Sequence, residues 1–187
     1  MTDYLTSLLT SLGMRRSVFV SYHHDNDQYY YNQLASVCDQ FCQLIRDASL
    51  REPLDSGDGD YIGRAIREGY ITGTSCTIVL CGSETWKRKH VDWEIKATLD
   101  KEHGLVGVNL PTNPVLPYGQ GGCWHPNGCS TKPQRLQDNI DSGYAGWASW
   151  ATITSSAARM KEIVEMAIGR PSVLIRNSME LMCRNLS

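Results

Sequence analysis

The chain has 187 residues and a mass of 20.9 kDa, enough for one domain that buries about 70% of its unfolded surface. Hydrophobic residues at 41% and charged residues at 20% exclude a disordered chain, and no apolar run approaches the roughly 20 residues of a membrane span. A net charge of -2 excludes the global basic field that holds a nucleic-acid backbone.

The amino-terminal region predicts a helix, a strand and a second helix. Leucines at helical spacing predict a short amphipathic helix over residues 3–13. Residues 16–22 mix β-branched and aromatic side chains without polar alternation, which is typical of a strand covered on both faces. After a polar loop at 23–27, apolar positions from Tyr30 to Ile45 follow steps of three and four and predict a long helix.

The next segment is more polar. Residues 45–50 are expected to form a short second strand, and residues 51–60 an acidic loop that contains glycine. Apolar positions between Ile62 and Tyr70 then predict a helix.

Regular alternation follows. Residues 75–81 predict a buried strand, residues 91–102 a helix that stops at Gly104, and residues 105–110 a further strand. Strands that alternate with helices in this way predict right-handed crossovers and an open, mostly parallel sheet. The expected fold is therefore α/β, of the flavodoxin-like or doubly wound class.

The carboxyl-terminal part changes character. Residues 111–139 hold five of the seven prolines and predict a long irregular excursion. A Trp-rich segment at 144–153 predicts an edge strand, residues 154–168 a capped helix, and Pro171 the start of a short helical tail. We interpret residues 1–187 as one domain whose core covers about 16–110 and whose extension, loop-rich and helical, covers 111–187.

The cysteine count and the amino end indicate the compartment. Four of the seven cysteines lie in apolar patterns and are expected to be reduced, buried thiols: Cys38, Cys42, Cys76 and Cys81. Cys123 and Cys129 match no common zinc spacing and are expected to be free thiols in a loop. Asp3 stands where a secretory signal carries Lys or Arg, so we expect a cytoplasmic protein.

Several sites of known chemistry are absent from the sequence. The glycines at 57–63 are spaced one residue too widely for a dinucleotide loop, and two aspartates stand where a pyrophosphate would approach. The same residues fail as a calcium loop. His23, His24, Asp25 and Asp27 are adjacent in the chain and are not expected to converge on a metal ion.

The informative segment is residues 82–95. Lys87, Arg88 and Lys89 stand just before a predicted helix amino terminus, where the helix dipole disfavours cations unless an anion such as phosphate is bound. Glu94 lies about one turn into that helix and is expected to reach the sheet edge beside Ser83. An equally weighted alternative is a structural i,i+4 pair with His90.

Three segments together resemble a TIR-like domain of the type found in the Thoeris anti-phage defence system: VFVSYH (18–23), TIVLCGS (77–83) and TWKRKHVDWEI (85–95). The resemblance covers about residues 16–110 and implies a flavodoxin-like fold. It also implies that NAD is the substrate, that no further cofactor is needed, and that Glu94 is the catalytic residue. The expected products are ADP-ribose or a cyclic ADP-ribose isomer, released as a signal to a partner effector.

The resemblance and the chemistry together name substrate-binding residues: Ser21, Tyr22, His23, Ser83, Trp86, Lys87, Arg88 and His90. Related sequences usually carry Trp at the position of His90, and we identify no resemblance in the segment after Asn109. A homo-oligomer is expected, and neither nucleic acid nor membrane is an expected partner. Two alternatives stay open: a non-catalytic interaction module, and an enzyme like the nucleoside deoxyribosyltransferases.

Overall fold

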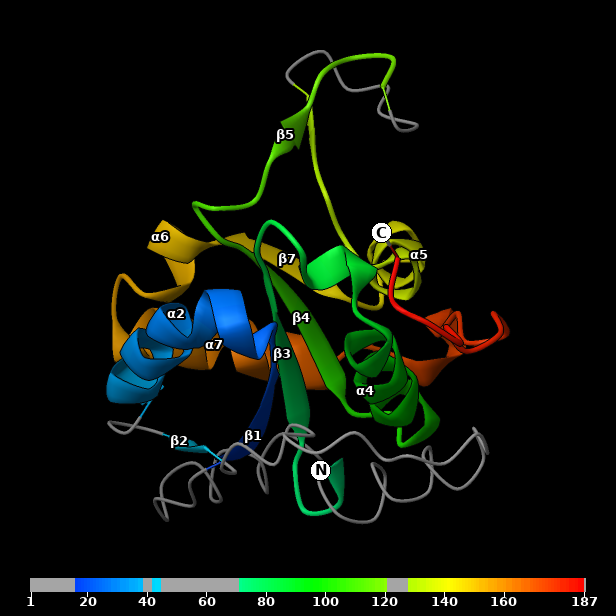
Figure 1. Ribbon diagram of the computed structural model, residues 1–187. Coiled ribbons are helices and arrows are strands. Elements are labelled where there is room, and N and C mark those ends of the chain that lie inside the picture. Colours follow the sequence, from blue (N-terminus) through cyan, green and yellow to red (C-terminus); the bar gives the residue numbers. More distant parts are fainter. Residues whose placement is uncertain (1–15, 39–41, 45–70, 121–127, 187) are drawn as a thin grey trace.

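The structure is a computed structural model that describes residues 16–38, 42–44, 71–120 and 128–186. Its centre is a sheet of five strands in the order β2-β1-β3-β4-β7, and every neighbouring pair is parallel (Figure 1). This order, 2-1-3-4-5 along the chain, is the flavodoxin-like one, which confirms the expected fold class. The strands are β1 (Arg16–Ser21), β2 (Cys42–Leu44), β3 (Cys76–Cys81), β4 (Gly104–Asn109) and β7 (Gly146–Ser149).

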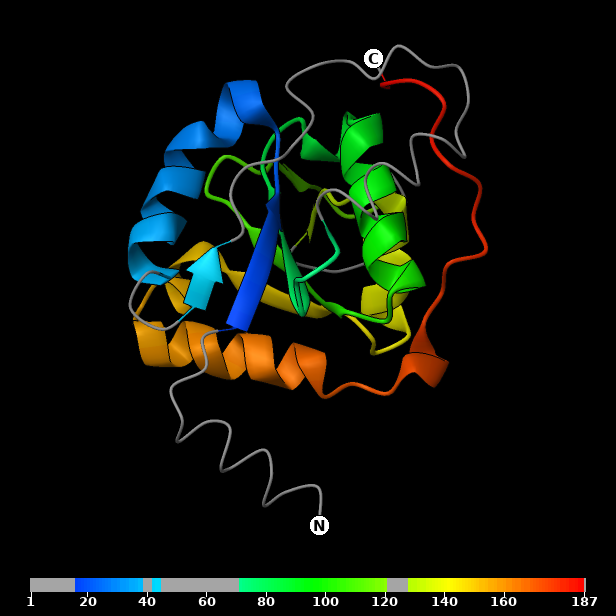
Figure 2. The ribbon, with the colours of Figure 1, turned by 90° about the horizontal axis from the view of Figure 1, so that it is seen from below.

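Helices cover both faces of the sheet, as Figures 1 and 2 show. One face carries α2 (His24–Cys38), α6 (Trp150–Ile153) and α7 (Ala157–Ile168). The other carries α4 (Lys89–Asp100) and α5 (Gln134–Asp141). Two short 3-10 helices, η2 (Thr85–Lys87) and η3 (Ser172–Leu174), complete the elements around them.

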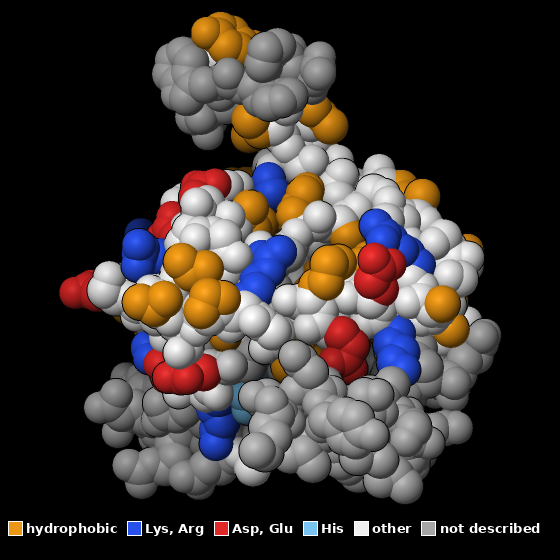
Figure 3. All heavy atoms as spheres, turned by 180° about the vertical axis from the view of Figure 1, so that it is seen from behind, with side chains coloured by type: hydrophobic (Ala, Val, Ile, Leu, Met, Phe, Trp, Pro, Cys, Tyr) orange, Lys and Arg blue, Asp and Glu red, His pale blue; other side chains and the backbone are white. Residues whose placement is uncertain are grey.

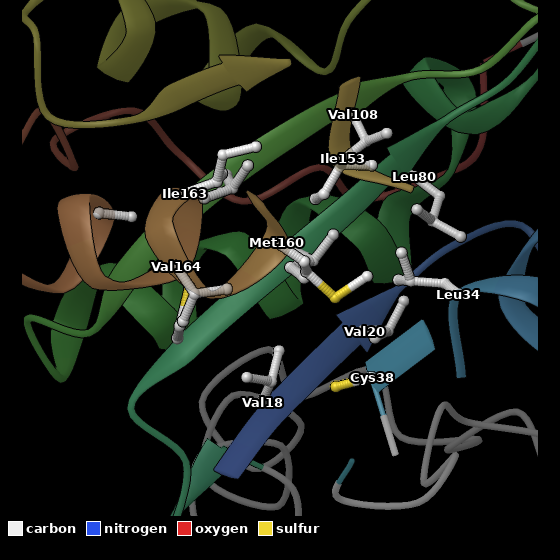
Figure 4. Packing of buried hydrophobic residues seen from close by; sticks show 14 of the residues in the cluster. Val18, Val20, Leu34, Cys38, Leu80, Val108, Ile153, Met160, Ile163 and Val164 are labelled. Carbon is white, nitrogen blue, oxygen red and sulfur yellow. The ribbon is translucent and has the colours of Figure 1, made fainter. Parts of the chain in front are cut away.

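The alternation of side chains along the strands divides the core into two layers. Val18 and Val20 of β1 pack on the side of α2 and α7, in the cluster that Figure 4 shows. Phe19, between them, packs against Trp93 and Ala97 of α4 on the opposite side. All six residues of β3 are buried, as expected for a strand covered on both faces.

Between β4 and α5 the chain leaves the body as an arm that carries β5 (Val115–Leu116) and β6 (Cys129–Ser130), paired antiparallel (Figure 1). Asn113 fastens its base, because its Nδ2 donates to the Thr131 carbonyl at 2.8 Å. Hydrophobic side chains lie exposed on this arm (Figure 3), among them Val115 and Tyr118.

Some predicted boundaries are wrong. The helix α2 begins at His24, within the segment expected to be a polar loop, because Asp25 and Asp27 occupy its first turn, where the helix dipole favours carboxylates. It ends at Cys38, and the expected helical residues 42–44 form β2 instead. The irregular excursion ends at α5 rather than at residue 139. The predicted elements at 3–13, 45–50, 51–60 and 62–70 lie outside the described residues.

Gly104 does not end the helix α4, contrary to the prediction from the sequence. The left-handed position after α4 is taken by Glu102, with φ of 55°. Gly104 is instead the place where β4 meets α7, since a Cβ there would lie 2.9 Å from the Ile168 backbone nitrogen. The predicted helix after residue 154 is confirmed as α7, with Ser156 Oγ accepting from the Arg159 N–H at 3.1 Å.

The tail after η3 is extended rather than helical. In Figure 2 it runs, coloured red, along the outside of α5 and α4 towards the amino end of α4. Backbone and side-chain hydrogen bonds fix it along this path, including one from Leu186 N to the Lys87 carbonyl at 3.0 Å. The tail is therefore part of the domain and covers the same face of the sheet as α4 and α5.

The cysteine predictions are confirmed in part. Cys76 and Cys81 are buried free thiols, and burial raises the pKa of each to about 12, so neither is a nucleophile near neutral pH. Cys38 and Cys129 are disulfide-bonded, so the prediction of free thiols is wrong for both. Sequence spacing did not reveal which cysteines approach one another in space. In the parts of the chain that the structure describes, no helix has the length and apolar character needed to cross a membrane.

Candidate functional site

The candidate site lies at the carboxyl ends of β1 and β3, the two central strands at which the strand order reverses direction. After β1 the chain turns to one side of the sheet, towards β2, and after β3 it continues to the other side, towards β4. Loops that leave adjacent strands in opposite directions separate at such a switch point, where ligands of open α/β sheets bind. The residues after Ser21 and after Cys81 therefore face the same region.

Glu94 is held against the end of β1. Ile95 and Leu99 of α4 pack on the sheet as predicted, and this orients the preceding residue towards β1. Ser21 lies on the same side of β1 as Phe19, and its Oγ donates to Glu94 Oε2 at 2.5 Å. Both residues are fully buried. The structure thus brings together the predicted catalytic carboxylate and one predicted substrate-binding residue.

Three histidines and an arginine lie close enough together at this edge of the sheet to influence one another: His23, His24, His90 and Arg88. Burial lowers the pKa of His90 to about 4, and repulsion from His24, His23 and Arg88 adds to the shift. The pKa of His23 is also lowered, first by burial and then by Arg88. A His90 that is neutral at pH 7 has no charge to offer Glu94, so the electrostatic i,i+4 pair is disfavoured.

A small polar network joins the two loops of the site. Gly82 N donates to Thr85 Oγ1 at 2.9 Å, and Thr85 Oγ1 donates to Asp27 Oδ2 at 3.0 Å. The Asp27 carboxylate lies so close to Gly82 that a Cβ at that position would overlap it. Burial raises the pKa of Asp27, and the hydrogen bond from Thr85 opposes that shift. The first turn of α2 is therefore fixed to the β3–α4 connection.

The basic segment before α4 is balanced within the chain. Lys87 Nζ and Arg88 Nη2 each lie 3.4 Å from a carboxylate oxygen of Glu84. The Lys89 backbone N–H donates to Asn185 Oδ1 of the tail at 2.9 Å. That donor at the helix amino terminus, at which we expected an anion to bind, is therefore occupied by the chain itself.

The remaining predicted residues divide between two places. Tyr22 is a fully buried core residue on the α2 side of the sheet, stacked on Tyr31 with ring centroids 4.8 Å apart. Ser83 and Trp86 are partly exposed in the β3–α4 connection, and Lys87 Nζ lies 5.4 Å from the centroid of the Trp86 ring. Ser83 and Trp86 are thus partly exposed at this edge of the sheet, whereas Tyr22, like Ser21 and Glu94, is fully buried.

Two residues that link the loops of the site, Asp27 and Thr85, were not predicted from the sequence. Asp27 was considered only as a metal ligand, and no group of three or more metal-ligating side chains lies within range of one ion in the described residues. Thr85 was noted only as part of a motif, although its hydroxyl links Asp27 to Gly82. An aspartate six residues after the end of β1 was the available signal, because carboxylates are favoured in the first turn of a helix.

The parallel sheet, its strand order and the residues at its switch point define a flavodoxin-like α/β domain. The family model of the Thoeris protein ThsB, TIR-like domain, matches residues 19–114, so the chain belongs to this family. A relative from Bacillus cereus (strain MSX-D12), named "Putative cyclic ADP-D-ribose synthase ThsB1", is 28% identical over 102 residues. The aligned region spans 52% of this chain and 53% of the relative, about half the length of each.

Proposed function

We propose that this protein cleaves the bond between nicotinamide and ribose in NAD. The observation that carries the proposal is the buried Glu94 carboxylate, held 2.5 Å from Ser21 Oγ at the switch point of a parallel sheet. Cleavage of an N-glycosidic bond passes through an oxocarbenium-like transition state, and a fixed carboxylate stabilises the positive charge that develops there.

The electron pair of the broken bond moves onto the nicotinamide ring and neutralises its pyridinium charge. Glu94 then faces the ribosyl cation, and Ser21 keeps the carboxylate in one orientation. Water attacks to give ADP-ribose, or a group of the same molecule attacks to give a cyclic isomer, and the attacking group loses its proton. Exclusion of water from the site would favour the cyclic product.

Residues of the β1–α2 and β3–α4 connections would hold the rest of the molecule. Trp86 would stack on a ring, and Ser83 would position the nucleotide. Arg88, near His23 and His90, and Lys87 would attract the pyrophosphate, and because both lie 3.4 Å from Glu84, that carboxylate offsets part of the charge of each. Tyr22 would act only indirectly, through the packing of β1 and α2.

The name of the Bacillus cereus relative, "Putative cyclic ADP-D-ribose synthase ThsB1", supports a cyclic ADP-ribose product. We propose that the product is the signal to a downstream effector in anti-phage defence, and that the enzyme works in the cytoplasm. A homo-oligomer is the proposed active form, since the arm exposes Val115 and Tyr118, at 59% and 61%, far from the apolar core.

The test is mass spectrometry of NAD incubated with concentrated wild-type protein and with Glu94→Gln. Loss of the carboxylate is expected to lower NAD cleavage by about 10³-fold, the scale of removing a principal electrostatic stabiliser. Glu162→Gln is the matched control, because Glu162 is an exposed glutamate on α7 that pairs only with Arg159 among its described contacts, and it should leave cleavage unchanged.

Two outcomes would contradict the proposal. If wild-type protein consumes no NAD, alone or with a lysate of infected cells, the non-catalytic interaction module becomes the better explanation. Turnover of nucleosides rather than NAD would favour the deoxyribosyltransferase-like alternative.

A further inference from the structure

Arg135 of α5 lies at the centre of a buried polar cluster that sequence analysis did not detect. Its side chain is fully buried and forms a two-pronged ion pair with Asp92 of α4, with Nε–Oδ1 at 2.9 Å and Nη2–Oδ2 at 3.2 Å. The three remaining guanidinium hydrogens go to the tail, to Asn177 Oδ1 and to the carbonyls of Met179 and Glu180, at 2.9–3.0 Å.

All five donors of this guanidinium are therefore used. Two go to one carboxylate, and three to a stretch of tail that has no regular structure of its own. The planar fork of arginine suits this division, and lysine, with three donors on one atom, could not reproduce it. Arg135 thus joins α5, α4 and the tail at a single point.

The tail in turn forms hydrogen bonds with the first turns of α4. Met182 is held on both sides, because its N–H donates to Asp92 Oδ2 at 3.0 Å and its carbonyl accepts from Trp93 Nε1 at 2.9 Å. The residue at the N-cap of α4, Arg88, provides no side-chain cap. Asn185 supplies the cap instead, through the Lys89 N–H, from 96 residues further along the chain.

These contacts fall immediately before Glu94. Asp92 and Trp93 precede it in α4, and the hydrogen bond from Ser21 to Glu94 requires that this turn keep its distance from β1. We propose that Arg135 is a positioning residue for Glu94: through Asp92 and the tail it fixes the first turns of α4, and this inference rests on the proposed function.

The test compares three variants. Arg135→Lys keeps the buried positive charge beside Asp92 but loses the fork, and deletion of residues 178–187 removes most of the tail contacts. Arg170→Ala is the matched control, because Arg170 also donates to one backbone carbonyl, that of Gly143, but at an exposed place away from α4.

The kinetic expectation is a fall in kcat of about 10- to 100-fold for Arg135→Lys, since a displacement of about 1 Å at a catalytic group can cost 100-fold. The KM for NAD should change less than threefold, and Arg170→Ala should match wild type. A peptide of residues 178–187, added in excess to the truncated protein, should restore part of the lost kcat.

A second measurement does not depend on activity. Amide hydrogen exchange of residues 89–94 should accelerate at least tenfold in Arg135→Lys and in the truncated protein, but not in Arg170→Ala. Unchanged exchange would overturn the inference, as would an unchanged kcat in an active wild type. If wild-type protein cleaves no NAD but exchange accelerates as expected in the two variants, the proposed function fails. The inference that Arg135 and the tail fix the first turns of α4 then still stands.

Discussion

The two faces of the sheet are fastened by different interactions. On the side of α2 and α7, side chains such as Leu34 and Met160 form a large apolar cluster (Figure 4), and the ion pair that joins β1 to α7, Arg16 with Glu165, is partly exposed. On the side of α4 and α5, apolar packing is joined by a buried ion pair and by the tail. Apolar packing has little directional preference, whereas hydrogen bonds fix angles and distances. The face that carries Glu94 is thus the one on which a fully buried ion pair and the tail add directional contacts to the apolar packing.

The largest expected effect on stability is that of a substitution at Leu34, on the α2 side of the sheet. Leu34→Ala opens a cavity in a fully buried part of the α2 face, and the free energy of unfolding should fall by about 3 kcal/mol. Activity per folded molecule should stay within twofold of wild type, because no contact of Glu94 changes. Chemical denaturation and NAD turnover at a temperature below the unfolding transition measure both quantities. A large loss of turnover in the folded variant would show that the two faces are coupled.

His90 makes the stability of the α4 side depend on pH. Its native pKa of about 4 lies below the ordinary value of 6.5, so between these pH values the unfolded chain binds a proton that the folded chain does not. Acidification from pH 6.5 to 4 should therefore lower the free energy of unfolding, by about 2 kcal/mol after allowance for partial exposure.

His90→Gln should flatten this part of the pH dependence of stability, which urea titrations at pH 4.5 and 6.5 would measure. The Leu34→Ala variant serves as control, since it should lower the curve without changing its slope. An unchanged slope in His90→Gln would mean that another group, such as His23 or His103, causes the acid sensitivity.

The smallest effects come from two helix caps. Ser156 caps α7 from the adjacent position, whereas Asn185 caps α4 from the tail. Ser156→Ala and Asn185→Ala should each lower the free energy of unfolding by about 1 kcal/mol or less. Only Asn185→Ala should also lower kcat, by a few fold, and parallel thermal melts and turnover assays compare them. Equal kcat values in the two variants would contradict the inference that the tail fixes the first turns of α4.

The sequence predicted those elements whose signal is local. The strands β1, β3 and β4 lie within one or two residues of their predicted bounds, because continuous apolar runs mark strands covered on both faces. The start of α2 was missed although Asp25 and Asp27 carried a local signal. The position of Glu94 followed from its motif, and its contact with Ser21 agrees with the alternation of side chains along β1.

The rest could not be predicted because the partners are distant in sequence. Arg135 lies in a segment predicted to be a loop, and its partners are 42 to 45 residues away along the chain. A charged residue is seldom buried, so composition and periodicity gave no reason to place it in the interior. The pairing of Asn185 with Lys89 is similarly non-local.

The route of the tail has a consequence for biosynthesis. Glu94 is translated long before Arg135, and Asn185 later still, so the first turns of α4 leave the ribosome without the contacts that fix them. Native contacts of such high sequence separation form late in folding. We therefore expect a nascent chain to hold an assembled sheet while the first turns of α4 stay unfixed until the segment that carries Asn185 has been synthesised.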